Sequence, residues 1–191
     1  LLPKSVLFSD ASWVKSNVGL TAAILDPLGT TTATRLTSSA NSATVGISQN
    51  IPTSQATGTN RQASIYIKRG NWDWIKLTIS DTTNGKSRVI WVNTATMTLG
   101  QNTITNTGTW VSTATAGFRI LRYLATDYYR ISCGAKNIPI GECKFTFELV
   151  DGDGVTTGNS TFTGIAGTPA FVDIWGAQFE NCSIVQNVPA E

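Results

Sequence analysis

Near its C-terminus the chain reads Val172-Asp173-Ile174-Trp175-Gly176-Ala177-Gln178-Phe179-Glu180. Apolar and polar residues are mixed along this segment and no proline interrupts it, so we expect an extended strand. The Trp175-Gly176 pair is unusual there, because glycine weakens a strand unless another backbone or a ligand has to approach closely. The segment therefore predicts a strand with a close neighbour at Gly176.

Short extended runs recur along the whole chain of 191 residues, with turn signals between them. No stretch of ten residues shows apolar residues at the period of a helix. Asn84-Gly85 lies between two runs and predicts a hairpin, because Asn-Gly favours a tight primed turn. The expected strands cover residues 18–24, 45 to about 52, 63–68, 74–79, 88–92, 104–111, 118–124, 128–133, 145–150 and 171–179. About a dozen strands predict an all-β protein, a single domain over 1–191 built as a two-sheet antiparallel β-sandwich of the jelly-roll type.

The composition argues against several classes of function. A net charge of +2, scattered along the chain, does not indicate a nucleic-acid partner. No apolar run approaches membrane-spanning length and no signal-peptide pattern opens the chain, so no membrane partner is expected. The absence of histidine excludes a Ser-His-Asp triad and a His-ligated zinc site within this chain. The chain begins with Leu1 and not Met, which indicates a processed or excised part of a longer protein.

The three cysteines are Cys133, Cys143 and Cys182, and none has the spacing of a metal knuckle. A disulfide between Cys133 and Cys143 is one interpretation, and small buried thiols are the favoured one. This cysteine usage fits assembly in a reducing cytoplasm slightly better than export.

The acidic residues do not form a recognisable metal-binding or catalytic motif. Asp151-Gly152-Asp153-Gly154 resembles the start of a calcium loop, but a plain turn is favoured because the further ligands are missing. A structural calcium ion stays open as the one cofactor to consider. No local pattern brings a general acid and a base together among the candidate carboxylates, so we do not expect an enzyme. The carboxylates considered are Asp73, Asp127, Glu148, Asp173 and Glu180.

Five segments, in order, resemble the carbohydrate-binding-module-like jelly-roll domains of bacteriophage tail and other virion proteins. They are Leu7–Trp13, Asp26–Leu36, Ser64–Lys68, Asp127–Cys133 and Ile174–Glu180. The third also resembles a strand of bacterial xylan- and glucan-binding modules. The chain departs from the family at Tyr128, where a Trp is usual, and no acidic pair follows Ile174, where related modules often hold calcium. The resemblance implies a non-catalytic glycan-binding domain located on a virion or outside the cell.

Strand alternation predicts which side chains face outward, because residues two apart share one face of a sheet. The aliphatic sets 65/67, 75/77/79 and 145/147/149 should face the core, as should Tyr129, Ile131 and Cys133. Three aromatic residues, each followed two positions later by a basic residue, should then be exposed. These pairs are Tyr66 with Lys68, Trp74 with Lys76, and Tyr128 with Arg130. Ser132 should share the exposed side of its strand, while the strand at 88–92 is ambiguous and leaves the side of Trp91 open.

Aromatic rings beside cations suit sugars. The C–H groups of a pyranose lie flat on an aromatic ring, and its hydroxyl, carboxylate or sulfate groups reach polar and cationic side chains at the edge. We therefore predict a side-by-side aromatic surface that binds a polysaccharide or cell-surface glycan, preferably acidic, with avidity from multivalent display. The candidate ligand-binding residues are Tyr66, Lys68, Trp72, Trp74, Lys76, Trp91, Tyr128 and Arg130.

Other interpretations of the aromatic residues stay open. A loop or a neighbouring subunit could cover the three pairs, with Lys and Arg stems packed along the rings. Trp13, Trp110 and Trp175 fit core or edge packing, and Trp72 fits either a ligand contact or a lid on the sandwich. The alternative functions are a structural virion module that contacts identical or other virion subunits, and an accessory module of a polysaccharide-degrading enzyme.

Overall fold

The structure of the protein, a computed structural model, describes residues 2, 5–41, 43–51, 59–83, 85–105, 118–123, 126–138, 142–155, 162–165 and 167–182. Within these ranges the chain forms twelve strands and no helix. Accordingly, the described part of the chain has no helical segment with the length and hydrophobicity needed to span a lipid bilayer. The strands form two antiparallel sheets of six strands each, which confirms the predicted all-β, two-sheet antiparallel sandwich.

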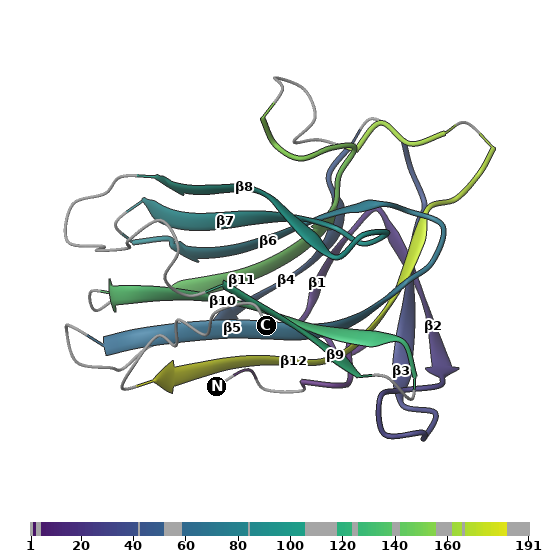
Figure 1. Ribbon diagram of the computed structural model, residues 1–191, viewed down its shortest axis with the longest axis horizontal. Coiled ribbons are helices and arrows are strands. Elements are labelled where there is room, and N and C mark those ends of the chain that lie inside the picture. Colours follow the sequence, from purple (N-terminus) through teal and green to yellow (C-terminus); the bar gives the residue numbers. More distant parts are fainter. Residues whose placement is uncertain are drawn as a thin grey trace.

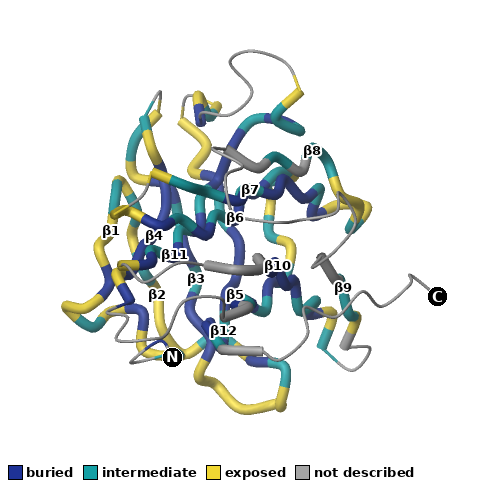
Figure 2. The backbone as a smooth tube through the Cα atoms, turned by 90° about the vertical axis from the view of Figure 1, so that its left-hand side faces the viewer, coloured by how far each residue is buried: buried dark blue, intermediate teal, exposed yellow. Residues whose placement is uncertain are grey.

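The two sheets form the two layers of the sandwich, which Figure 2 shows end-on and Figure 1 from the side. Sheet A runs in the order β1 (Val14–Ser16), β4 (Val45–Ile51), β11 (Cys143–Leu149), β6 (Trp74–Asp81), β7 (Lys86–Asn93) and β8 (Thr98–Thr105). Sheet B runs in the order β2 (Val18–Ile24), β3 (Ala33–Ser38), β12 (Phe171–Cys182), β5 (Thr59–Arg69), β10 (Tyr128–Ile138) and β9 (Phe118–Tyr123). Some neighbours follow one another in the sequence, such as β6 and β7, whereas β12 lies between β3 and β5, which come from distant parts of the chain.

Most predicted strands are present, with shifted ends. β6 and β7 pair from Trp74↔Asn93 to Asp81↔Lys86, so a tight connection joins them as predicted, with Gly85 at φ 64°. The strand expected at 104–111 is wrong in its start, because β8 begins at Thr98; residues 106–111 lie outside the described residues. The alternation did not reveal β1, which is too short to show a period.

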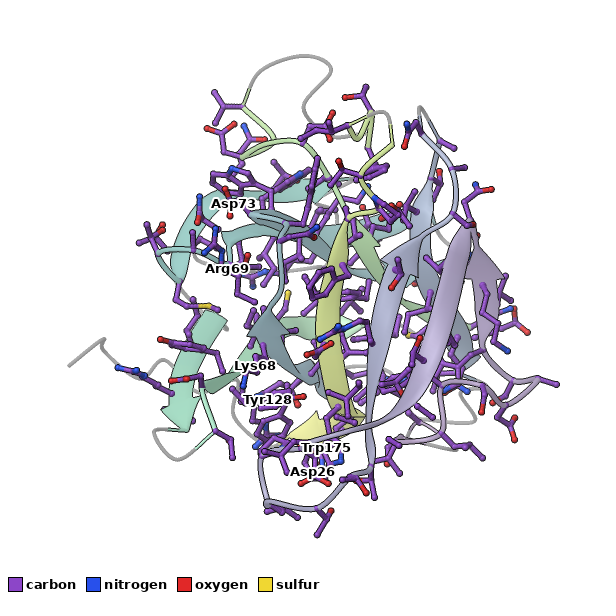
Figure 3. All side chains as sticks on the ribbon, turned by 90° about the vertical axis from the view of Figure 1, so that its right-hand side faces the viewer. Asp26, Lys68, Arg69, Asp73, Tyr128 and Trp175 are labelled. Atoms are coloured by element: carbon purple, nitrogen blue, oxygen red, sulfur yellow. The ribbon has the colours of Figure 1, made fainter. Side chains whose placement is uncertain are left out.

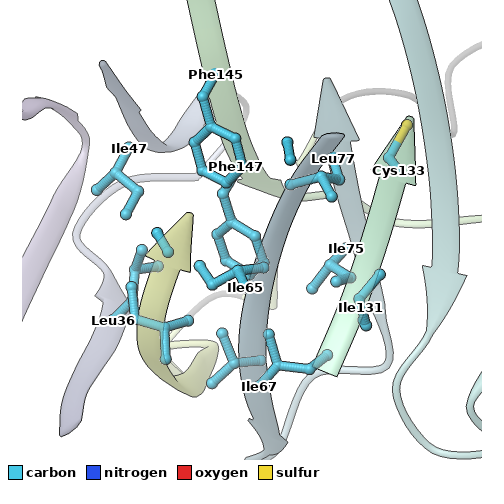
Figure 4. Packing of buried hydrophobic residues seen from close by; sticks show 14 of the residues in the cluster. Leu36, Ile47, Ile65, Ile67, Ile75, Leu77, Ile131, Cys133, Phe145 and Phe147 are labelled. Carbon is cyan, nitrogen blue, oxygen red and sulfur yellow. The ribbon is translucent and has the colours of Figure 1, made fainter. Parts of the chain in front are cut away.

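The core lies between the sheets and follows the alternation predicted from the sequence (Figure 4). Ile75, Leu77 and Ile79 of β6 are fully buried, while the residues between them are half-exposed. Burial of each such side chain away from water stabilises the fold by about 1.5–3 kcal/mol. Trp13 packs on Phe8 and Phe145, with ring centroids 5.1 and 6.0 Å away, so its interpretation as a core residue is confirmed.

The inner side of the sandwich also holds two free thiols. Cys133 and Cys143 are buried and unbonded, which supports the favoured interpretation over the disulfide; the side chain of Cys182 lies outside the described ones. Burial raises the pKa of the Cys133 thiol to about 11, although the nearby Arg88 guanidinium opposes the shift. Arg88 is itself buried and donates to the Gly134 carbonyl oxygen at 2.6 Å.

The C-terminal strand β12 contains an irregularity at the Trp-Gly pair. Its register with β5 shifts between Trp175 and Gln178, and Gly176 has φ 56°. A Cβ atom on Gly176 would lie 3.3 Å from Cδ2 of Tyr66, in addition to the strain of the left-handed backbone. The close neighbour predicted at Gly176 is therefore the Tyr66 ring.

Candidate functional site

The predicted aromatic residues are divided between the two outer surfaces of the sandwich. Tyr66, Lys68 and Arg130 lie on the outer side of sheet B, together with Trp175; we call this surface the Tyr66 face. Trp74, Lys76 and Trp91 lie on the outer side of sheet A, here the Trp91 face. The prediction of one side-by-side aromatic surface is therefore wrong. Alternation separates inward from outward residues, but it does not say which strands share a sheet.

On the Tyr66 face three neighbouring strands bring two aromatic rings and a guanidinium together. Tyr66 of β5 lies opposite Arg130 of β10 on one side and opposite Trp175 of β12 on the other. The Tyr66 and Trp175 ring centroids are 5.1 Å apart and the ring planes meet at 71°. Both side chains are half-buried, so the rings form a partly open corner and not a flat platform. The interpretation of Trp175 as core packing is corrected by this position.

Arg130 ties the three strands together behind the rings. Its Nη2 donates to Ser64 Oγ at 2.9 Å and to Gln178 Oε1 at 2.6 Å, and its Nε donates to Ser64 Oγ at 3.2 Å. Its Cζ also lies 5.7 Å from the Tyr66 ring centroid, a distance at which a guanidinium is attracted to the ring face. Ser64 and Gln178 were not among the predicted site residues, because only the strand order places them beside Arg130.

Lys68 supplies a cation next to this corner. It lies opposite Asp173 of β12, but the Asp173 carboxylate is engaged by Arg35, whose Nε and Nη2 donate at 2.8 and 3.1 Å. Among the described residues, the Lys68 ammonium has neither an ion pair nor a hydrogen bond. In Figure 3 Lys68 lies at the same end of the sheet as Tyr128, Trp175 and Asp26. The half-buried ammonium is therefore available to an anionic or hydroxyl group.

Tyr128 does not contribute an open ring, which corrects its prediction as an exposed aromatic. It points to the outer side of β10 but is fully buried, and its hydroxyl donates to the Leu25 carbonyl oxygen at 2.9 Å. Burial, with the nearby Asp173 and Asp26 carboxylates, holds the pKa of the Tyr128 phenol well above its usual range. Ser132, also predicted to be exposed, is buried. At Tyr128 the cause is a covering loop, which strand alternation cannot reveal.

The covering segment at Tyr128 is the loop 25–32, which Asp26 organises. The buried Asp26 carboxylate accepts five hydrogen bonds, from the backbone N–H groups of Leu28, Thr30 and Thr32 and from the hydroxyls of Thr30 and Thr32. Burial alone would raise the pKa of Asp26, but these donors outweigh it and hold the pKa far below its usual range. Thr32 Oγ1 in turn accepts from Trp175 Nε1 at 2.8 Å. The loop is thereby fastened to the aromatic corner.

The Trp91 face is closed by comparison. Trp91 is only 6% exposed, because Gly154 lies directly over its ring. The Lys76 ammonium is 2.8 Å from Glu148 Oε2, and the two side chains are 18% and 14% exposed, so this cation is already paired. Trp74 is half-buried, with its ring against Gly100. This arrangement leaves little aromatic surface for a ligand.

Trp72 acts as a lid on the end of the sandwich. Its Nε1 donates to the Val150 carbonyl oxygen at 2.7 Å, and its ring packs on Phe162 with a centroid distance of 4.9 Å. Of its two interpretations, the lid is the one that these contacts support. Trp110 lies outside the described residues.

The Asp151–Gly154 segment is a turn whose two carboxylates accept hydrogen bonds from backbone N–H groups of residues that follow it. Asp151 Oδ2 accepts from Thr163 N at 2.8 Å and Asp153 Oδ1 accepts from Val155 N at 2.9 Å. Over the described ranges, no group of three or more His, Cys, Asp or Glu side chains lies close enough to hold a metal ion. The contacts support the plain turn.

The chain is similar to three solved structures, two of which are much longer than this chain. The enzymatically active domain of bacteriophage CBA120 tailspike protein 4 matches with a TM-score of 0.50 and 14% identity, over 95% of this chain and 21% of that one. A Clostridium thermocellum xylanase with CBM22-1 and GH10 modules, solved with xylohexaose, matches with a TM-score of 0.47 and 12% identity, over 94% and 28% of the chains. TmCBM61, solved with β-1,4-galactotriose, matches with a TM-score of 0.37 and 16% identity, over 78% and 95%.

These similarities concern the fold. The chain spans about a fifth of the length of the tailspike domain and little more than a quarter of the xylanase. No protein-family model matches the sequence. No curated protein matches it either.

Proposed function

We propose that this chain binds a polysaccharide or cell-surface glycan through the Tyr66 face, without catalysing a reaction. The observation that carries the proposal is the half-open corner of Tyr66 and Trp175, with the Lys68 ammonium at the same end of the sheet and unpaired within the part of the chain that the structure describes. A sugar ring could stack its C–H groups on one aromatic ring and meet the edge of the other.

Lys68 favours an acidic glycan. A carboxylate or sulfate on the bound sugar would form a charge-assisted hydrogen bond with the ammonium. Arg130 is less free to do so, because Ser64 and Gln178 already accept from its guanidinium. We expect oligogalacturonate, an acidic pyranose oligomer, to bind better than neutral xylohexaose, and the difference to shrink at high salt.

We further propose that the domain belongs to a phage tail or another virion surface protein. The five motifs quoted above support this context, and the fold is compatible with it. An accessory module of a polysaccharide-degrading enzyme is the alternative context, and the flanking sequence of the parent protein distinguishes the two.

A glycan array tests the binding proposal. Tyr66→Ala and Trp175→Ala are each expected to lower the array signal about twofold to tenfold, because each removes an aromatic contact worth roughly 0.5–1.5 kcal/mol. Trp74→Ala on the Trp91 face is the matched control and should keep the signal. Thermal unfolding of each variant separates loss of binding from loss of folding.

Two results would contradict the proposal. Silence of the folded parent protein across acidic and neutral glycans, together with a stable oligomer that buries Tyr66 and Trp175, would favour a structural virion module. An equal loss of signal in Trp74→Ala would move the binding surface to the other sheet.

A further inference from the structure

The indole N–H of Trp175 donates its hydrogen bond within the protein. It donates to Thr32 Oγ1 at 2.8 Å, and that hydroxyl donates to Asp26 Oδ2 at 2.6 Å. Thr32 is 143 positions from Trp175 in the sequence and lies in the loop 25–32, not in a neighbouring strand of β12. The hydrogen bond is therefore a cross-link between a loop and the aromatic corner.

The end of this cross-link is rigid. The Asp26 carboxylate also accepts from Thr32 N at 3.2 Å, so both the backbone and the side chain of Thr32 are fixed to one buried group. A second attachment holds the loop to the sheet, because Leu25 O accepts from the buried Tyr128 hydroxyl. A hydrogen bond to an ionised group is about twice as strong as a neutral one. The Thr32 Oγ1 atom that accepts from the indole is therefore held in one position.

The other side of the Trp175 ring is fixed by packing. The ring meets Tyr66 at 71°, and Tyr66 lies against Gly176, where a Cβ atom would come within 3.3 Å of its ring. One hydrogen bond and one edge contact together leave the indole little freedom to rotate. A ring held in its bound orientation saves the entropy that a mobile side chain would lose on binding, about 0.5–1.5 kcal/mol.

We propose that Asp26 and Thr32 are positioning residues that hold the Trp175 ring in the orientation used for binding, although neither touches the ligand. This inference rests on the proposed function of the Tyr66 face. It also implies that Trp175 contributes ring surface and no hydrogen-bond donor. Sugar hydroxyls would then find their polar partners elsewhere on the face, such as Lys68.

The test is Thr32→Val, which keeps the side-chain shape and removes the hydroxyl. In ¹H–¹⁵N spectra the Trp175 indole signal, assigned through Trp175→Phe, should shift, and its exchange with water should accelerate at least about tenfold. Affinity for oligogalacturonate should fall about threefold to tenfold, as for one net hydrogen bond. Thr32→Ser should restore both values, because it retains the hydroxyl.

Thr94→Val provides the control for a purely structural effect. The Thr94 hydroxyl donates to the Trp72 carbonyl oxygen at 2.6 Å, so its loss also removes one part-buried hydrogen bond, but away from the Tyr66 face. The Trp175 signal and the affinity should both be unchanged in Thr94→Val. An equal drop in affinity in both variants would overturn the positioning role.

The two proposals fail in different ways. An indole signal that stays in place in Thr32→Val overturns the positioning of Trp175, whatever the protein binds. A parent protein that binds no glycan, or whose glycan binding survives Tyr66→Ala, overturns the proposed function instead, and the indole measurement still decides whether Thr32 holds the ring.

Discussion

On the Tyr66 face the loop 25–32 is fastened to the aromatic pair at one edge, whereas on the Trp91 face the turn 151–154 lies on top of its tryptophan. The first arrangement buries Tyr128 but leaves Tyr66 and Trp175 half-exposed. The second leaves only 6% of Trp91 exposed. Both surfaces are outer sheet faces with two or more aromatic residues and a lysine, so the covering segment decides which of them can meet a ligand.

The charges differ in the same way. On the Trp91 face Lys76 is paired with Glu148, and both are largely buried. On the Tyr66 face the acid opposite Lys68 is Asp173, which Arg35 has already neutralised. A cation is useful for recognition only where no protein carboxylate satisfies it, and Lys68 meets that condition with respect to the carboxylates that the structure describes.

The largest expected effect comes from a glycine in each covering segment. Gly154 and Gly29 have nearly the same backbone, φ 81° and 82°, but a Cβ on Gly154 would lie 2.5 Å from the Trp91 ring, while a Cβ on Gly29 would meet nothing within 4 Å. Gly154→Ala should cost about 3 kcal/mol, from left-handed strain plus overpacking. Gly29→Ala should cost about 1 kcal/mol, from strain alone. Urea unfolding measures both.

Equal losses in these two variants would mean that the turn 151–154 moves away from Trp91 without cost. In that case the Trp91 face would be an open surface like the other one, and the contrast between the faces would disappear.

A smaller effect is expected at Asp26, together with a dependence on pH. Asp26→Asn should lower the free energy of unfolding by about 2 kcal/mol at pH 7, because hydrogen bonds to an ionised carboxylate are weakened or lost. The folded-state pKa lies below the unfolded value, so as pH falls the unfolded chain takes up the proton first. The contribution is complete above the unfolded pKa of about 4 and is lost progressively below it.

Thermal unfolding of the parent and Asp26→Asn between neutral and acidic pH measures this dependence. The gap between the two melting temperatures should narrow as the pH falls. A gap that stays constant down to the lowest pH would show that the Asp26 charge does not stabilise the loop.

The smallest effect is expected at Tyr128. Tyr128→Phe removes the hydrogen bond to the Leu25 carbonyl oxygen and should cost about 1 kcal/mol, with the ring still filling its space. The raised pKa of the folded phenol means that this stabilisation is present below pH about 10 and is lost as the pH rises further, because the unfolded chain ionises first. Denaturant unfolding at pH 7 measures the cost. An unchanged free energy would indicate that the Tyr128 hydroxyl adds nothing to the attachment of the loop 25–32 that the Trp175–Thr32 hydrogen bond provides.

Much of the fold could be predicted from local pattern. Ile65 and Ile67, like the aliphatic residues of β6, face the core as alternation indicated, because a strand buried on one side must place every second residue inward. The candidate site was harder. Of the predicted residues, Tyr66, Lys68 and Arg130 lie together on the Tyr66 face. Trp175 was interpreted as core or edge packing, although alternation from the buried Val172 and Ile174 turns it outward.

Local sequence was sufficient to place strands and their inward sides, since the period of two depends only on backbone geometry and the hydrophobic effect. It could not bring Thr32 to Trp175 or put Trp74 on the opposite surface from Tyr66. Those relations depend on strand order and on the path of the loops, which are set by long-range packing between segments far apart in the chain. The tertiary structure alone decided which aromatic residues stayed open to solvent.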